Sequence, residues 1–282
     1  MTNGAFCYII DDTNGKERIG MYTDPVFLGM TLYDIFLLVG IVAVFFVADK
    51  MTVKLGFSVA LQRIVIVGAF LSVVLGYGSA VLFQAFYNYM DSGVFEIASN
   101  TGATFFGGLI GGVAVFLIVW FFIAGRFCKD KDEPKKRFFD ILDIAACCVP
   151  LAHAFGRIGC LFGGCCHGAP TEEWYGIEMH TETYGYQKVV PVLLFEAIFL
   201  FLLAAALIAL FIKNRGDKKF PLAIAYCFAY GLWRFFIEYA RADDVGATVV
   251  SFLSPSQLVA ILLILAGTAI AVWCFLRKRK EK

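Results

Sequence analysis

Long apolar stretches recur along the chain, and shorter polar segments separate them. A helix that crosses a membrane needs about 20 consecutive, mainly apolar residues, and seven stretches approach this length. They cover residues 29–48, 64–86, 103–124, 141–162, 189–212, 221–239 and 257–276. The pattern predicts an all-α fold, namely a polytopic integral membrane protein with seven transmembrane helices.

The composition agrees with this interpretation. The chain has 282 residues, of which 60% are hydrophobic, whereas soluble domains are about half apolar. We expect a single transmembrane domain over residues 1–282 and no separate soluble module. Residues 1–28 are polar and mixed, so we identify no cleavable signal peptide and expect the first apolar stretch to direct insertion.

Positive charge alternates between the polar segments. The segments after the first, third and fifth apolar stretches, together with the C-terminal tail, contain 18 of the 24 lysine and arginine residues. Because positively charged loops stay in the cytoplasm, we expect the N-terminus outside and the C-terminus inside, as seven spans require. Residues 164–188 then form the longest extracytoplasmic loop, which is either a lid facing a substrate or a cap at the membrane interface.

Charged residues of several predicted spans approach one level, in the outer half of the membrane. Arg157 lies in the outer half of the fourth stretch, and Glu196 lies near the outer start of the fifth. The sixth stretch ends with Arg234, Glu238 and Arg241, whose spacings of four and three residues place them on one helix face. Charged groups inside a membrane are costly, so these residues are candidates for function.

The arginines at this level indicate a phosphate ligand. A guanidinium group offers a planar set of donors that matches the oxygen atoms of a phosphate. Glu238 can hold Arg234 in place or act as a base. The alternative is a buried ion pair that only joins helices, but one carboxylate does not neutralise both Arg157 and Arg234.

Residues 153–168, HAFGRIGCLFGGCCHG, contain further reactive groups. His153 lies one helical turn from Arg157, so it either joins the same site or packs as a hydrogen-bonded histidine. A cluster of thiol and imidazole groups follows, at Cys160, Cys165, Cys166 and His167. Its spacing is not that of a standard zinc site, and we expect no metal. A disulfide and a reactive thiolate stay open beside the interpretation as small packing residues.

Glycines at four-residue spacing lie on the third stretch. They are Gly107, Gly108, Gly111 and Gly112. This spacing is typical of close helix packing in membranes, and the alternative is that a lipid headgroup approaches the backbone there.

Five segments resemble motifs of the prolipoprotein diacylglyceryl transferase family, over residues 30–275. They are Gly156-Arg157-Ile158-Gly159 with the glycine-rich stretch closing at Gly168, the third-span motif Gly107–Gly111, the segment PVLLFE that ends at Glu196, the sixth-span segment from Arg234 to Arg241, and SPSQ at residues 254–257. The resemblance implies the seven-span fold. It also implies an activity, the transfer of a diacylglyceryl group from phosphatidylglycerol to the lipobox cysteine of a preprolipoprotein peptide, with release of glycerol phosphate.

The resemblance also implies roles for individual residues. Arg157 would bind the lipid phosphate, Arg234 would stabilise charge on the departing phosphate, and Glu238 would orient it. The remaining substrate-binding positions would be Gly156, Gly159, Gly168, Gly107, Gly108 and Arg241. It implies no cofactor and no nucleic acid, and it places the protein in the bacterial plasma (inner) membrane.

Three departures from the family pattern mark a divergent member, and the loss of histidine removes a favoured proton acceptor. Phe106 stands where the family has histidine, Cys160 stands where it has asparagine, and the glutamate within the signature is missing. His153 or His167 can supply the missing imidazole, and we place His153 among the catalytic residues. The rival interpretations are a transferase with another acceptor, a non-catalytic protein that binds anionic lipids, and a thiol-redox protein.

Overall fold

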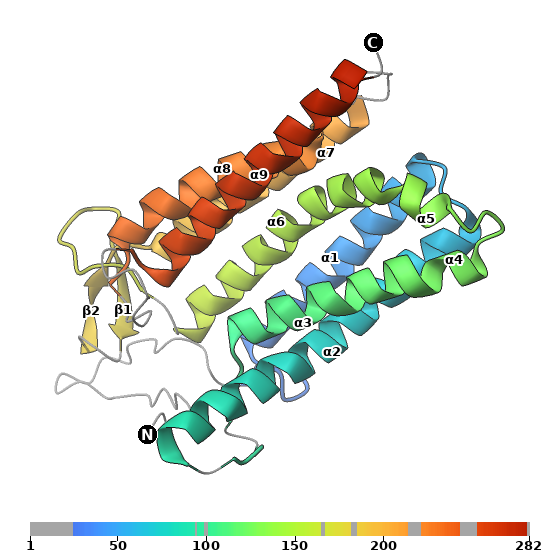
Figure 1. Cartoon of the computed structure of the whole chain (residues 1–282). Helices are drawn as coiled ribbons and strands as arrows, with labels where there is room; N and C mark the ends of the chain where they lie inside the picture. The colour runs from blue at the N-terminus through green and yellow to red at the C-terminus, as the bar shows by residue number, and fades with distance from the viewer. Residues whose placement is uncertain are drawn as a thin grey trace. The chain divides into compact units, whose positions relative to one another are not determined.

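The computed structural model describes residues 25–93, 95–98, 101–164, 167–181, 185–213, 221–242 and 253–280 (Figure 1). These residues form two compact units. One contains Phe45–Ile141, and the other contains the described residues up to Val44 and from Leu142 onward. The prediction of a single domain stays a prediction, and each unit is described by itself.

Six helices of the described chain are long and apolar enough to cross a membrane. They are α1 (Leu32–Lys54), α2 (Val59–Ser92), α3 (Phe105–Ile118) continued through the π-helix η1 (Val119–Ile123) and α4 (Ala124–Phe127), α6 (Phe138–Gly163), α7 (Val192–Lys213) and α9 (Pro255–Lys280). The prediction of a mainly helical, polytopic membrane protein is confirmed.

The one predicted span not among these six helices is the sixth in chain order, residues 221–239, and it corresponds to a shorter helix. α8 (Leu222–Ile237) has 16 residues and is followed by the 3-10 helix η2 (Glu238–Ala240). At 1.5 Å per residue, α8 is about 24 Å long, whereas the hydrocarbon core is about 30 Å thick. The number of seven spans therefore stays a prediction.

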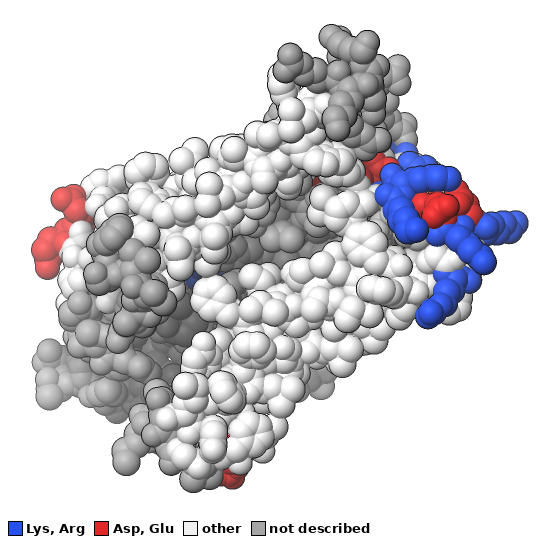
Figure 2. Space-filling view, in the orientation of Figure 1, with Lys and Arg blue, Asp and Glu red and all other residues white. Residues whose placement is uncertain are grey.

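The polar segments after the first and third predicted spans meet at one end of the first unit. Ser58 caps α2 by accepting a hydrogen bond from Leu61 N (3.2 Å), and Ser58 N donates to Glu133 Oε1 (2.9 Å) in the short helix α5 (Glu133–Lys136). Arg137 pairs with Asp140 at 3.0 Å. In Figure 2 the lysine and arginine side chains gather over α4 and α5, around several carboxylates. The two segments share one end, as the charge alternation predicts.

Close packing explains the glycines of α3. A Cβ added to Gly111 would lie 2.4 Å from Ser79 Cβ of α2, and one added to Gly107 would lie 2.6 Å from Phe83 Cβ. Gly108 would place its Cβ 3.4 Å from Ala80 Cβ. These contacts favour helix packing over headgroup approach at Gly107 and Gly111, because no methyl group fits between the helices there.

The second unit contains the first part of α1, most of α6, and α7, α8 and α9. Ala154 of α6, Leu200 of α7 and Tyr230 of α8 form a buried apolar cluster. Aromatic pairs extend it, with Phe199 stacked on Trp233 at 4.2 Å between ring centroids. This cluster joins α6, α7 and α8, and its Tyr230 also belongs to the polar network described next.

The segment predicted as the extracytoplasmic loop, residues 164–188, contains a β-hairpin in an otherwise mainly helical chain. β1 (Ile177–Thr181) and β2 (Gly185–Val189) are antiparallel, with Ile177 opposite Val189. Apolar Ile177 and Met179 alternate with polar Glu178 and His180 between two glycines, a period-two pattern typical of a strand.

Backbone hydrogen bonds tie this hairpin to the end of α8. Val190 N donates to Ala169 O (2.9 Å), and Ala169 N donates to Ala240 O (3.1 Å). Gly168 pairs with Arg241 in an antiparallel bridge. The loop therefore holds the backbone of Arg241 in a fixed position.

Packing at the α2–α3 interface predicts a difference between two glycines. We expect Gly111→Ala to destabilise the protein by about 1–3 kcal/mol, since the added methyl group overlaps Ser79. Gly78→Ala of α2 is the matched control, because its Cβ would meet nothing within 4 Å. Denaturant unfolding in detergent micelles, followed by circular dichroism, measures both. Equal stability of the two variants would contradict the packing interpretation.

Candidate functional site

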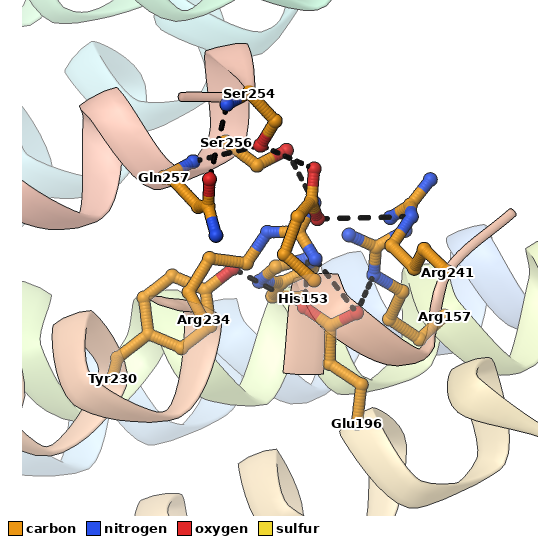
Figure 3. A network of polar contacts seen from close by, with 10 residues as sticks. His153, Arg157, Glu196, Tyr230, Arg234, Arg241, Ser254, Ser256 and Gln257 are labelled. Carbon is orange, nitrogen blue, oxygen red and sulfur yellow. Dashed lines mark hydrogen bonds and ion pairs between the residues drawn. The ribbon is translucent and has the colours of Figure 1, made fainter. Parts of the chain in front are cut away.

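Glu196 of α7 is the centre of a buried polar network in the second unit. Only 1% of the residue is exposed. Its Oε2 lies 2.9 Å from Arg157 Nε of α6 and 3.9 Å from Arg234 Nη1 of α8. Figure 3 shows both guanidinium groups converging on this carboxylate from different helices. Glu196 therefore offsets part of the charge of both arginines.

The other oxygen of Glu196 faces a hydroxyl and an imidazole. Tyr230 OH donates a hydrogen bond to Glu196 Oε1 (3.3 Å), and His153 Nε2 lies 3.8 Å from the same atom. The His153 ring packs edge-on against the Tyr230 ring, with 5.4 Å between centroids. His153 is thus held beside the arginines by aromatic packing and by the carboxylate.

Glu238 is the second carboxylate of the network. Its Oε2 lies 2.9 Å from Arg234 Nη2 and 3.9 Å from Arg241 Nε. Its Oε1 accepts a hydrogen bond from Ser254 Oγ (2.6 Å). The predicted shared face of Arg234, Glu238 and Arg241 is confirmed in its contacts. However, the α-helix ends at Ile237, and Glu238 lies in a 3-10 turn.

The start of α9 completes the site with a capping box. Ser254 Oγ accepts from Gln257 N (3.2 Å), and Gln257 Oε1 accepts from Ser254 N (3.1 Å). Pro255 occupies the first helical position, where its missing N–H costs nothing. Arg234 Nη2 donates to Ser256 Oγ. The SPSQ segment therefore begins the helix and also binds Glu238 and Arg234.

The network carries excess positive charge and unsatisfied donors. Its three arginines and two glutamates leave one positive charge among these five side chains. Arg157 Nε and Arg234 Nη1 are buried, and within the described residues no acceptor is aligned with either N–H. Arg157 Nε is near Glu196, but the contact lacks hydrogen-bond geometry. Buried donors in proteins are usually satisfied, so the site is suited to an added anion.

The structure brings together five predicted residues, namely His153, Arg157, Arg234, Glu238 and Arg241. The argument that a single carboxylate faces the two arginines is wrong, because Glu196 is the second. Glu196 was already a candidate at this level of the membrane, but it was not counted as a partner of the arginines. Tyr230 was missed, although it lies one helical turn before Arg234.

The predicted glycines have different surroundings. A Cβ on Gly168 would lie 2.3 Å from Val190 O, and one on Gly159 would lie 3.1 Å from Tyr33 Cδ2 of α1, so both positions are tightly packed. Gly156 would place its Cβ in open space. Gly107 and Gly108 belong to the first unit, where they pack against α2. Their roles in substrate binding stay predictions.

The cysteine cluster is described only in part. Cys160 is half-buried, and Cys165 and Cys166 lie outside the described residues. His167 is buried, and its Nδ1 lies 3.1 Å from Gly168 O. Within the described ranges, no three histidine, cysteine, aspartate or glutamate residues converge in a group that could hold a metal ion.

Comparison with known proteins identifies the relatives of this chain. Residues 25–273 match the family model described as prolipoprotein diacylglyceryl transferase. The phosphatidylglycerol–prolipoprotein diacylglyceryl transferase of Clostridium tetani is 29% identical over 239 residues, covering 83% of this chain and 89% of that protein. The Staphylococcus aureus (strain bovine RF122) enzyme of that name is 30% identical, covering 89% of each chain.

The central carboxylate predicts a strong effect on stability. We expect Glu196→Gln to lower the free energy of unfolding by about 3–5 kcal/mol, because it leaves Arg157 without its carboxylate partner. Glu172→Gln, on an exposed loop residue, should change it by less than about 0.5 kcal/mol. Unfolding in micelles followed by tryptophan fluorescence tests the pair. A Glu196 variant as stable as the Glu172 variant would contradict the prediction that the Glu196 carboxylate stabilises the folded protein.

Proposed function

The chain belongs to the prolipoprotein diacylglyceryl transferase family, and on that premise we propose that it transfers a diacylglyceryl group from phosphatidylglycerol to the lipobox cysteine thiol of a preprolipoprotein. The observation that carries the proposal is the buried network of three arginines and two glutamates, with one excess positive charge. A phosphodiester donor carries one negative charge and suits this balance. The relatives, named as phosphatidylglycerol–prolipoprotein diacylglyceryl transferases, support the choice of substrates.

The reaction is a displacement at a glycerol carbon. The cysteine sulfur forms a bond to that carbon while the bond from carbon to the phosphate oxygen breaks, and glycerol phosphate leaves. The leaving phosphate gains a second negative charge. Arg157 holds the phosphate, and Arg234 stabilises the charge that develops on it, through donors that Glu196 and Glu238 keep in position.

A proton acceptor is needed for the thiol, and we assign this role to His153. Its imidazole lies in the network, one helical turn from Arg157 and 3.8 Å from Glu196 Oε1. Glu196 stabilises the imidazolium that forms when the proton arrives, because the two groups then attract each other. The missing family histidine, replaced by Phe106, thus has a substitute on α6.

The proposed membrane arrangement has seven spans, with α8 as the sixth in chain order and η2 at its outer end. The cytoplasmic side carries the basic end of the first unit and the C-terminal tail. The network then lies in the outer half of the bacterial plasma membrane, where phosphatidylglycerol and a translocated lipobox peptide both have access. Gly156, with open space beside it, and Arg241 lie beside the donor headgroup in this arrangement.

A transfer assay tests the proposal. Purified protein in detergent, given phosphatidylglycerol and a lipobox peptide, should raise the peptide mass by one diacylglyceryl group and release glycerol phosphate. Arg157→Ala and Arg234→Ala should each lower turnover at least about 100-fold, as expected when a donor to developing charge is removed. Arg63→Ala, on an exposed arginine of the first unit, should leave turnover unchanged. Folded protein that binds the lipid without turnover would favour a non-catalytic lipid-binding protein.

His153 is tested separately from lipid binding. His153→Phe keeps an aromatic ring against Tyr230 but removes the base, so kcat should fall about 100-fold while KM for phosphatidylglycerol changes little. The acidic limb of the pH profile should also vanish, since it reports protonation of the imidazole. His167→Asn is the comparison. Loss of turnover in that variant, with His153→Phe active, would assign the base to His167 instead.

A further inference from the structure

Helix α8 begins without a capping side chain of its own. Its N-cap residue is Pro221, which has no side-chain oxygen to accept a hydrogen bond. The first N–H groups of a helix have no partner within the helix, and leaving them unsatisfied is costly in a membrane protein. Leu222 and Ala223, the first two residues of α8, are both buried, so water does not solvate this end freely.

Asp143 of α6 supplies the missing cap. Its Oδ1 accepts hydrogen bonds from Leu222 N (2.7 Å) and from Ala223 N (3.3 Å). A carboxylate at a helix N-terminus also interacts favourably with the helix dipole. The cap therefore comes from a different helix, and it ties the starts of α6 and α8 together.

This tie fixes the positions of the two arginines along their helices. Arg157 lies 14 residues after Asp143 on α6, and Arg234 lies 12 residues after Leu222 on α8. At 1.5 Å per residue these separations are about 21 and 18 Å. The two arginines thus reach nearly the same height above one anchored end, where both face Glu196.

Helix α6 depends on such an anchor because of Pro150. This buried proline lies between Asp143 and Arg157, and it removes one backbone hydrogen bond from the helix. A slip of α8 by one residue against α6 would move Arg234 by 1.5 Å and rotate it by about 100°. A misplacement of about 1 Å can cost about 100-fold in an enzyme rate.

We propose that Asp143 is a positioning residue that sets the register of α6 against α8, and through it the spacing of Arg157 and Arg234 around the donor phosphate. This inference rests on the proposed function for the identity of the ligand, phosphatidylglycerol. The register of the two helices rests on the hydrogen bonds of Asp143 alone. Asp143 lies about 20 Å from the network and does not touch it. Its effect on binding therefore passes through the helices.

The first test compares substitutions at Asp143. Asp143→Ala should raise KM for phosphatidylglycerol about tenfold, because the displaced arginines bind the donor phosphate. KM for the lipobox peptide should stay within about twofold, because the arginines do not bind the peptide. Asp143→Asn keeps an oxygen that can accept from both N–H groups and should restore most of the affinity. Asp140→Ala is the matched control, because it removes a carboxylate from the preceding turn of α6 that pairs with Arg137. An unchanged KM in Asp143→Ala would overturn the proposal.

A double variant separates register from simple capping. Pro221→Ser gives α8 an N-cap of its own, at a position whose backbone is already extended. In the Asp143→Ala/Pro221→Ser protein, we expect thermal stability to return while KM for phosphatidylglycerol stays raised. Recovery of both would show that Asp143 only stabilises the helix, and would overturn the positioning role.

Lipid binding distinguishes this inference from the proposed function. If the unmodified protein binds phosphatidylglycerol micelles without turnover, the transferase proposal fails. Asp143→Ala should still weaken that binding about tenfold, and Asp140→Ala should not. Equal binding by the two variants would overturn the positioning role whatever the outcome of the transfer assay.

Discussion

Charge balance in a low-dielectric environment is the constraint on which the second unit depends. A cation among membrane helices is costly unless an anion lies close to it. Here the anions come from other elements: Glu196 of α7 pairs with Arg157 of α6, and Glu238 of η2 pairs with Arg234 of α8. The Arg157–Glu196 pair thus restricts how α6 and α7 can pack, while the Arg234–Glu238 pair lies within one continuous helical segment. The charges that make the site suited to a phosphate are the same charges that hold its helices together.

Polar groups at helix ends serve two purposes in this unit. Ser254 accepts the capping hydrogen bond that begins α9 and donates to Glu238, so the start of one helix is linked to the carboxylate at the end of another. At the opposite end, Asp143 of α6 satisfies the first N–H groups of α8. In both places the hydrogen bond that satisfies a helix terminus also sets the position of a neighbouring helix. The site is therefore positioned by bonds at both ends of α8.

The sequence was informative where one physical requirement dominates. Apolar length predicted the long helices, and the cost of intramembrane charge predicted that Arg157, Arg234 and Glu238 belong to one site. The sequence was less informative about which charged residues pair with one another. Glu196 stood in an apolar stretch with no local feature to show which arginine it meets, since that depends on how α7 packs. The β-hairpin was missed because its alternation is only five residues long in each strand. The 3-10 turn at Glu238 was missed because spacings of three and four fit either helix type.

The match to the family and the departures from it fall on different parts of the chemistry. The phosphate network needs several charges in balance, contributed by separate elements. Replacing Glu196 removes the carboxylate that pairs with Arg157, and breaking a buried ion pair in this way costs about 3–5 kcal/mol. The segments that supply these charges are the ones whose sequence resembles the family motifs. A proton acceptor needs only one imidazole within reach of the thiol, and it is neutral before it acts. Under the proposal that His153 is the base, moving the imidazole from the position of Phe106 to His153 leaves the resting charge balance unchanged. On that proposal, a change of base is the substitution that this site can tolerate while its donor chemistry is kept.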